Sequence, residues 1–340
     1  MSKEFNVAVV GATGLVGRQL LEILEEREFP VGEARFLASD KSEGEFLDFR
    51  GDALLVQCLD EEAFTGINLV FFCAPAAVSA RFGPVAARAG AVCIDLTDAW
   101  RHDADVPLLL PEVNPQEIAQ ARGKKIIAIP GAAAVALALV LKPLHDLSPL
   151  RRLVVTSLQA VSGSGQSGMD ELRVQCGELL NGRPCEAKVF PRQIAFNCLP
   201  QTGSFAADGV DNEEAAMIAD LRRLFDFPEL KISVTTVRMP VFYGHSAAVN
   251  VEAQGALDPN QARAALTVAP GVELVDDPTA GDYPTPLDAA GRDEVQVGRL
   301  RADASRAGGL DLWLAADNLR TGAALPAVRL AELLLLGSEE

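Results

Sequence analysis

Two rhythms of apolar and polar residues alternate along roughly the first 150 positions of the chain. Apolar runs of strand type recur there, at residues 5–10, 34–38, 69–73 and 91–95. Stretches with helical spacing of their apolar residues, such as 18–26 and 76–89, separate them. Strands that alternate with helices pair in parallel through right-handed crossovers. This part of the chain therefore predicts an α/β domain with a Rossmann-like parallel sheet.

The pattern changes after residue 150. Longer strands appear, at residues 153–158, 232–238 and 245–252, and the last two alternate apolar with polar positions. Residues 162–168 are rich in Ser and Gly and predict a flexible loop, which a helix over 169–180 follows. These elements predict an α+β domain with a mostly antiparallel sheet.

The change of pattern divides the chain into two domains, and 340 residues are enough for two sizeable cores. The first domain spans residues 1–130 and is completed by a C-terminal helix within 316–340, where 318–336 form an apolar helical stripe. The second domain spans residues 131–315. Its stretch 270–293, rich in Pro, Gly and Asp, predicts irregular structure.

A glycine-rich turn joins the first strand to the first helix. Glycines let a backbone approach a pyrophosphate, and a helix N-terminus supplies unpaired N–H groups with a partial positive charge. The order strand, turn, helix is the context that a dinucleotide fingerprint requires. The predicted cofactor-binding residues are Gly11, Thr13, Gly14, Leu15, Val16 and Gly17. A tight turn without a ligand is the alternative.

The composition of the chain argues against several classes of partner. The net charge of −17 argues against nucleic acid and anionic membranes, which require a basic face. Pro130 and Gly131 split the longest apolar stretch, which falls short of the roughly 20 residues that span a membrane. The six cysteines show no metal-binding spacing, so we expect no metal. Because the first residues show no signal-peptide pattern, we expect a cytoplasmic protein.

Further motifs follow the glycine turn, at residues 106–114 (VPLLLPEVN), 126–147 (IIAIPGAAAVALALVLKPLHDL), 159–163 (QAVSG), 213–217 (EEAAM), 238–246 (RMPVFYGHS) and 317–324 (DNLRTGAA). Together they resemble the aspartate-semialdehyde dehydrogenase family over nearly the whole chain. The resemblance implies a fold with a dinucleotide-binding domain and a catalytic-type domain that also dimerises. It implies an NADP-dependent oxidoreductase of amino-acid biosynthesis, acting on an aldehyde, and a homodimer.

One departure from the family affects the chemistry directly. Where the family has Pro-Asn-Cys, this chain has Pro130-Gly131-Ala132, so Ala132 occupies the position of the nucleophile. In the family the thiolate attacks the aldehyde carbon, the adduct expels hydride to the nicotinamide, and phosphate releases the acyl group. A methyl group cannot form that bond. Ala216 also stands where the family has a lysine that contacts phosphate.

The remaining site residues take their roles from the resemblance. His245 corresponds to the base that activates the thiol, and Gln159 to the residue that orients the substrate. The substrate-binding positions, for a small carboxylate and for phosphate, are Arg101, Arg238 and Glu213. The positions that approach the cofactor from the second domain are Ser162, Gly163 and Asn318.

The choice of cofactor stays open between NADP and NAD. Ser39, Lys41 and Ser42 match in type the family residues that hold the 2′-phosphate of NADP. Asp40, Glu43 and Glu45 add negative charge beside them, which weakens or abolishes NADP binding if they face the phosphate. Asp40 or Glu43 could instead accept the ribose hydroxyls and favour NAD, or these acids could point into solvent.

Three hypotheses remain about function. The first is a non-catalytic homodimer that retains dinucleotide binding, in which neither Cys176 nor Cys198 replaces the lost thiol. The second is an active oxidoreductase that acts on an aldehyde or oxo group of a small carboxylate by direct hydride transfer, with His245 as proton donor. The third is a non-catalytic partner subunit or regulator of an active paralogue.

Overall fold

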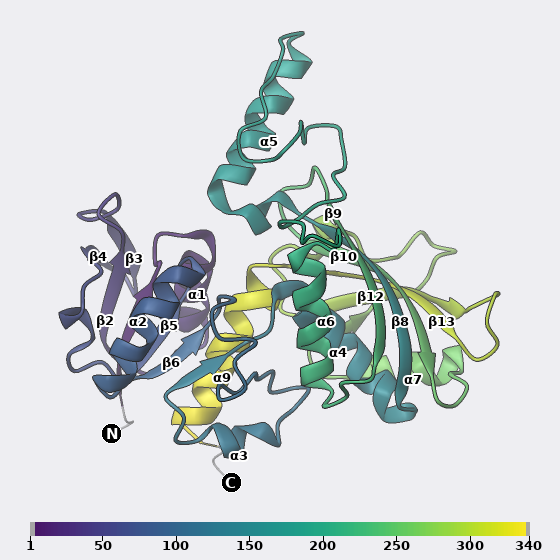
Figure 1. Cartoon of the computed structure of the whole chain (residues 1–340), viewed down its shortest axis with the longest axis horizontal. Coiled ribbons are helices and arrows are strands. Elements are labelled where there is room, and N and C mark those ends of the chain that lie inside the picture. The colour runs from purple at the N-terminus through teal and green to yellow at the C-terminus, as the bar shows by residue number, and fades with distance from the viewer. Residues whose placement is uncertain (1–3, 338–340) are drawn as a thin grey trace. The chain divides into compact units, whose positions relative to one another are not determined.

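The structure is a computed structural model that describes residues 4–337. It divides into two compact units. Figure 1 labels helices and strands of both units, with the chain coloured by residue number. The first unit comprises Met1–Gly131 and Ala323–Glu340, and the second comprises Ala132–Gly322. The fold is α/β, with a Rossmann-like first unit and a second unit built on a sheet with both parallel and antiparallel pairs.

The first unit is built on a seven-stranded sheet in the order β3-β4-β2-β1-β5-β6-β7. The central strand, β1, pairs in parallel with β2 and β5, so the predicted parallel sheet is confirmed. Its strands are β1 (Phe5–Val10), β2 (Val31–Ala38), β3 (Phe46–Phe49), β4 (Asp52–Cys58), β5 (Leu69–Phe72), β6 (Val92–Asp95) and β7 (Ile126–Ala128). Its helices are α1 (Leu15–Glu26), η1 (Glu62–Phe64), α2 (Ala76–Arg88), α3 (Glu117–Ala121) and α9 (Leu325–Leu335).

Helices cover both faces of this sheet because its central strands are apolar on both sides. Val7 and Val9 of β1 belong to the core that includes α1 and α9. Ala8 and Val10, which alternate with them, belong to the core that includes α2. Successive side chains of a strand point to opposite faces, so one apolar run serves both layers.

The second unit is built on a six-stranded sheet in the order β11-β12-β13-β10-β8-β9. β10 lies antiparallel to β8 and β13, whereas β8 and β9 are parallel. The strands are β8 (Leu150–Gln159), β9 (Lys231–Arg238), β10 (His245–Ala253), β11 (Val272–Leu274), β12 (Val295–Ala302) and β13 (Leu310–Ala316). The helices are α4 (Ala132–Leu147), η2 (Val161–Ser164), α5 (Gly165–Leu180), α6 (Asn212–Leu224), α7 (Pro259–Thr267) and α8 (Pro286–Ala289), before the π-helical turn η3 (Arg320–Ala324).

Two predicted elements differ from the structure. The loop expected over 162–168 is a short 3-10 turn, after which α5 begins at Gly165. Its glycines serve packing, because a Cβ on Gly168 would lie 2.8 Å from the Val161 carbonyl oxygen. The C-terminal helix expected over 318–336 begins only at Leu325, after the wider π-helical turn.

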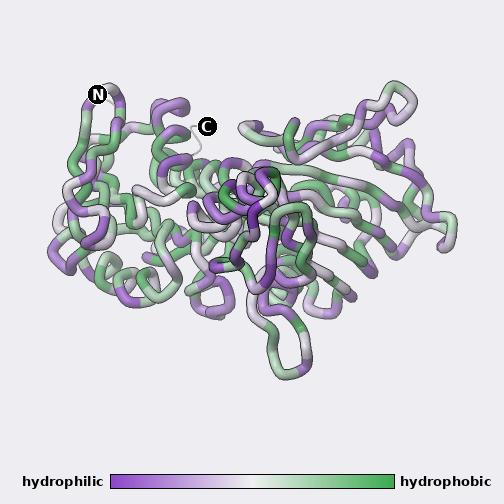
Figure 2. The backbone as a smooth tube through the Cα atoms, turned by 90° about the horizontal axis from the view of Figure 1, so that it is seen from above, coloured by the Kyte–Doolittle hydropathy of each residue, from purple (hydrophilic) through white to green (hydrophobic). Residues whose placement is uncertain are grey.

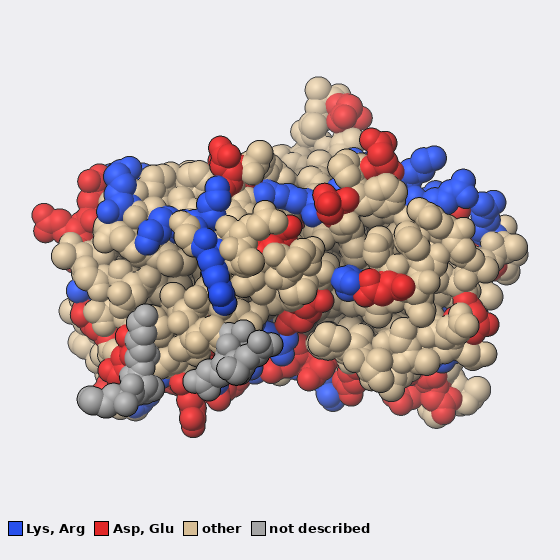
Figure 3. All heavy atoms as spheres, turned by 90° about the horizontal axis from the view of Figure 1, so that it is seen from below, with Lys and Arg blue, Asp and Glu red and all other residues tan. Residues whose placement is uncertain are grey.

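Helix α4 is largely buried, from Ala133 to Leu141 without a break. Figure 2 shows hydrophobic and hydrophilic segments alternating along the whole backbone. On the face drawn in Figure 3, acidic and basic side chains are both scattered among uncharged residues. Within residues 4–337, the longest apolar helices are too short or too polar to cross a membrane.

Candidate functional site

The glycine turn of the first unit requires glycine for steric reasons. Gly11 has a φ of +87°, and a Cβ on it would lie 2.8 Å from the carbonyl carbon of Cys73. A Cβ on Gly17 would lie 2.3 Å from the Gly11 carbonyl oxygen. Side chains at these positions would push the turn away from β5 and from the start of α1. The turn is therefore as tight as a phosphate-binding turn must be.

The first turn of α1 presents backbone N–H donors directly after the glycine turn. Gly14 immediately precedes the helix, which begins Leu15-Val16-Gly17 and carries no acidic residue in its first turn. The first N–H groups of a helix have no partner within it, and the helix dipole adds positive charge. These donors fit a pyrophosphate, as the sequence predicted, and they fit a nicotinamide dinucleotide as the cofactor.

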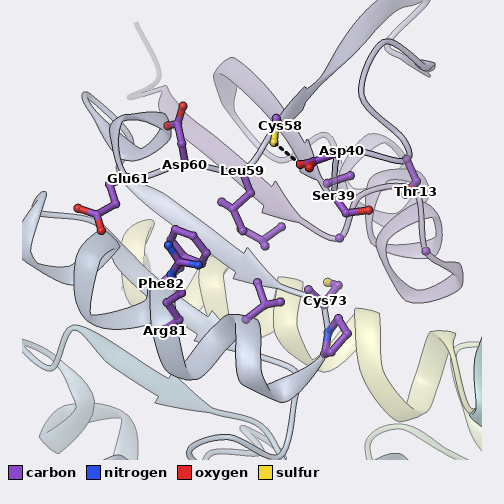
Figure 4. Close-up of a pocket in the computed structure, with 17 residues that line it drawn as sticks. Thr13, Ser39, Asp40, Cys58, Leu59, Asp60, Glu61, Cys73, Arg81 and Phe82 are labelled. Atoms are coloured by element: carbon purple, nitrogen blue, oxygen red, sulfur yellow. Dashed lines mark hydrogen bonds between the residues drawn. The ribbon is translucent and has the colours of Figure 1, made fainter.

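A cavity of about 610 Å³ opens beside this turn. Figure 4 shows Thr13, Ser39 and Asp40 on one side of it, and Arg81 and Phe82 on the other. The cavity reaches across the carboxyl ends of β2, β4 and β5, which is where ligands bind open α/β sheets.

The predicted residues after β2 divide into two groups. Ser39 and Asp40 line the cavity, whereas Lys41 and Ser42 are not among its lining residues. Ser42 lies beside it, with its hydroxyl 3.4 Å from that of Thr13. Glu43 does not line the cavity either.

Several lining residues were missed by the sequence analysis. Cys58 ends β4, and its thiol donates to Asp40 Oδ1 across 3.0 Å. This hydrogen bond is the largest of several effects that raise the pKa of the Cys58 thiol. Asp60 and Glu61 follow β4 and add two more carboxylates to the wall. Their position after a strand of the same parallel sheet was the signal that could have found them.

The second unit brings five predicted residues together around Gly163. A Cβ on Gly163 would lie 2.7 Å from Arg238 Nη1 and 3.5 Å from His245 Cε1. Pairing of β8 with β9 sets Gln159 beside Arg238. Ser162, which precedes Gly163, donates its hydroxyl hydrogen to Asn318 Oδ1 across 3.1 Å. We call Gln159, Ser162, Gly163, Arg238, His245 and Asn318 the polar cluster.

The Arg238 guanidinium is buried and fixed by backbone oxygens. It donates to the Ala160 carbonyl across 2.8 Å and to the Thr202 carbonyl across 3.2 Å. Burial lowers the pKa of Arg238, and the carboxylates of Glu213 and Asp211 partly oppose this. The arginine stays charged, because its ordinary pKa lies far above neutrality. The cluster therefore holds a permanent cation.

His245 is a hydrogen-bond donor through Nε2. Its Nδ1 accepts the Ala160 backbone N–H across 3.2 Å, which assigns the hydrogen of the neutral ring to Nε2. Burial, and then the charge of Arg238, lower the pKa of His245 to about 3. The ring is therefore neutral near pH 7, and its Nε2 cannot accept a proton in this tautomer.

Gln159 carries the clearest sign of a ligand in this unit. Its side chain is buried, with 3% exposure, and Nε2 has no hydrogen-bond partner among residues 4–337. A buried amide without a partner costs free energy, roughly 1–3 kcal/mol. A bound oxygen atom would remove that cost.

The predicted nucleophile position lies at the start of a helix. Ala132 is the first residue of α4, and a Cβ on Gly322 would lie 2.8 Å from the Ala132 Cβ. The backbone at Gly322 thus closes one side of the methyl group. The side chain itself offers no donor, acceptor or lone pair.

The other two predicted substrate residues are Arg101 and Glu213. Arg101 belongs to the first unit, where Nη2 donates to the Leu96 carbonyl across 3.3 Å. Glu213 lies in the first turn of α6 and acts on Arg238 through its charge. Among residues 4–337, no group of three or more His, Cys, Asp or Glu side chains could hold a metal ion.

Comparison with known proteins agrees with this arrangement. The model of the semialdehyde dehydrogenase NAD-binding domain matches residues 6–121, and that of the semialdehyde dehydrogenase dimerisation domain matches residues 141–321. Aspartate-semialdehyde dehydrogenase 2 of Vibrio cholerae is 45% identical over 336 residues, covering 98% of this chain and 99% of the relative.

The chain belongs to the aspartate-semialdehyde dehydrogenase family.

Two further matches define its place among these relatives. The crystal structure of aspartate semialdehyde dehydrogenase II from Vibrio cholerae, complexed with ASA, superposes with a TM-score of 0.96 at 44% identity, covering 99% of this chain and 100% of that one. The USG-1 protein homolog of Azotobacter vinelandii is 44% identical over 336 residues, covering 98% of this chain and 99% of the relative. Relatives of equal similarity thus carry different names. This family member has an NAD(P)-binding domain and the family's dimerisation domain.

Proposed function

We propose that this family member is a non-catalytic homodimer of the cytoplasm, which binds a nicotinamide dinucleotide in its first unit and a small carboxylate in its second. The observation that carries the proposal is alanine at position 132, the first residue of α4. The covalent route of the family needs a nucleophile with a lone pair at that position. Losing a nucleophile costs many orders of magnitude in rate, because orientation by the remaining residues cannot replace a bond.

Three of the other thiols are poorly suited to replace the missing nucleophile. Burial raises the pKa of Cys73 strongly and that of Cys93 to about 12, so neither ionises near neutrality. Cys176 packs against a small core that contains Val161 and Leu172. Such a thiol acts as a core residue and not as a nucleophile.

The polar cluster supports binding of a carboxylate. Arg238 supplies a buried positive charge, His245 supplies Nε2–H, and Gln159 supplies an amide without a partner in the described chain. All three are hydrogen-bond donors, and carboxylate oxygens only accept. Binding would satisfy the Gln159 amide and strengthen the cluster.

The same geometry weakens the alternative of direct hydride transfer. Reduction of an oxo group requires hydride at carbon and a proton at oxygen. Because the pKa of His245 is lowered to about 3, its charged form, which gives up a proton readily, is scarce near pH 7. Loss of Nε2–H from the neutral ring would leave an imidazolate anion. His245 can therefore hold a carbonyl oxygen but is a poor proton donor.

A turnover assay tests the proposal. The purified chain is mixed with aspartate semialdehyde, phosphate and either NADP or NAD, and formation of the reduced nicotinamide is followed by absorbance. The Vibrio cholerae relative serves as a positive control. We expect no turnover by the chain. Turnover within the ordinary range of enzymes, about 1–1000 per second, would overturn the proposal.

A second arm separates the thiol from the rest of the site. The variant Ala132→Cys restores sulfur at the start of α4 but leaves Gly131, Ala216 and the His245 tautomer unchanged. We expect at most a trace of activity, because His245 Nε2 carries a hydrogen and cannot take the proton of the thiol. Full activity in this variant would show that alanine at position 132 is the sole cause of the loss.

The dimer and the two ligands have tests of their own. Sedimentation of the purified chain should give a dimer, and mixing it with an active paralogue carrying a different tag tests the partner-subunit alternative. A nicotinamide dinucleotide should raise the melting temperature, because a ligand that binds only the folded state stabilises it. No shift with either NAD or NADP would remove nucleotide binding from the proposal.

A further inference from the structure

The residues that line the cavity beside the glycine turn are arranged to suit the adenosine half of a dinucleotide. Thr13 and Gly14 lie at the end where the pyrophosphate would bind. Leu59, Val78 and Phe82 give an apolar wall that suits a flat adenine ring. Asp40 follows the end of β2 at Ala38, the place from which Rossmann folds contact the adenosine ribose.

We propose that this cavity selects NAD against NADP, through an Asp40 carboxylate that the Cys58 thiol holds in position. The inference rests on the proposed binding of a nicotinamide dinucleotide to the first unit. It assigns Asp40 as the specificity-determining residue and Cys58 as a positioning residue.

The hydrogen bond from Cys58 orients the carboxylate. Its thiol donates to Asp40 Oδ1 across 3.0 Å. This leaves Oδ2 to accept from a ribose hydroxyl, as an ionised carboxylate accepts at both oxygens. The bond also raises the pKa of Cys58, so the thiol keeps the hydrogen that it donates. Asp40 lies two residues after the end of β2, whose last residue, Ala38, pairs with Cys58 at the end of β4.

The charges along the cavity oppose a 2′-phosphate. Three carboxylates line it, from Asp40, Asp60 and Glu61, against one guanidinium, from Arg81. That guanidinium stacks over the Phe82 ring, 4.6 Å from its centroid, and lies on the far side of the cavity from Asp40 in Figure 4. Lys41, which matched the family's basic position in type, does not line the cavity.

The expected discrimination follows from Coulomb's law. A phosphate group on the ribose carries a charge of about −1.5 to −2 near neutral pH. At about 4 Å, repulsion between one phosphate charge and one carboxylate charge is about 1 kcal/mol even in water. That energy lowers the affinity several-fold. We therefore expect NAD to bind at least about tenfold more tightly than NADP. Added salt should narrow the difference, because screening acts on exposed charges.

Calorimetric titration of the full chain tests the inference. NAD and NADP are compared first, and then AMP with adenosine 2′,5′-bisphosphate, which probe the first unit without a nicotinamide ring. Replacing Asp40→Asn removes the charge and keeps the shape. It should lower the preference for NAD at least about tenfold, chiefly by tightening NADP. The control Glu43→Gln removes the same charge three residues further on, outside the cavity lining, and should leave the preference unchanged.

Variants at Cys58 test the positioning role. Cys58→Ala removes the donor, and we expect weaker binding of AMP and NAD with little change in melting temperature. Cys58→Ser keeps a donor and should restore both affinities, which a purely structural role would not predict.

The possible outcomes distinguish failure of this inference from failure of the proposed function. Tighter binding of NADP than NAD by the native chain, or an unchanged preference in Asp40→Asn, would overturn the inference and leave dinucleotide binding intact. Absence of binding by all four ligands would overturn both. Turnover in the semialdehyde assay bears on the non-catalytic proposal alone.

Discussion

Replacing Gly163→Ala should damage the polar cluster by displacing the Arg238 guanidinium. Gly163 lies in the 3-10 turn Val161–Ser164, against Arg238 and His245. A methyl group there would lie 2.7 Å from Arg238 Nη1. Nonbonded carbon contacts prefer about 3.5–4.0 Å, so the guanidinium has to move by roughly 0.8 Å.

The size of the effect follows from what holds the guanidinium. Moving Nη1 away from Gly163 breaks or stretches its 2.8 Å bond to the Ala160 carbonyl. A hydrogen bond to a charged group contributes about 1.5–3 kcal/mol. Alanine also lowers the conformational entropy of the unfolded chain, which offsets up to about 1 kcal/mol of this loss in stability. We expect a net loss of roughly 1–2 kcal/mol in the free energy of unfolding of the second unit.

Urea unfolding measures this loss. The chain has two tryptophans, Trp100 in the first unit and Trp313 in the second, so a Trp100→Phe background makes fluorescence report the second unit. The matched control is Gly177→Ala on α5, where a Cβ meets no atom within 4 Å. That variant should gain about 0.5–1 kcal/mol from helix propensity. A Gly163→Ala protein as stable as the native one would refute the argument that Arg238 is pinned.

Gly11, Asp211 and His245 each give one further prediction. Gly11→Ala should abolish the melting shift with nucleotide and cost at least roughly 2 kcal/mol, whereas Gly51→Ala, with a similar φ of +83° but open space, should keep the shift. Asp211→Ala removes the cap that accepts the Glu213 N–H, and should cost about 1–2 kcal/mol in urea unfolding; an unaffected midpoint would contradict it. Since the pKa of His245 falls from 6.5 to about 3 on folding, its neutral form stabilises the protein above pH 6.5, and this contribution is lost as pH falls towards 3. His245→Gln should flatten that part of the stability curve, and an unchanged slope would count against the burial of a neutral ring.

Local patterns predicted most of the first unit. The glycine turn and the apolar strands are each specified by a few neighbouring residues, so the parallel sheet and the tight turn after its first strand could be predicted directly. β4 was missed, because only Val56 of its seven residues is buried and its pattern is weak. Cys58, Asp60 and Glu61 were missed with it. The sequence could not show that Cys58 reaches Asp40, since this depends on the register between β2 and β4.

In the second unit, too, the sequence predicted the strands but not which of their residues lie side by side. Its strands β8, β9 and β10 were found from alternation, but pairing sets which residues meet. Gln159 lies opposite Arg238 through a parallel register, and Ser246 opposite Leu158 through an antiparallel one. The loop predicted over 162–168 became a turn and a helix, because the glycine at 168 meets the Val161 carbonyl and the Phe190 ring closely. Glycine content there reflects close packing, which a single sequence cannot distinguish from flexibility.

Retention of the family motifs in the second unit is weak evidence for retained chemistry. Asn318 Oδ1 joins two segments by accepting from the Ser162 hydroxyl and the Gly244 N–H. Arg238 joins two more through the Ala160 and Thr202 carbonyls. Removing either would leave buried polar groups unpaired, so the fold itself requires both residues whether or not a reaction occurs. The Gln159 amide differs, because no hydrogen bond within residues 4–337 uses its nitrogen. A role in the fold explains the first two residues and leaves this one unexplained, so Gln159 is the residue of this cluster whose retention argues for a ligand.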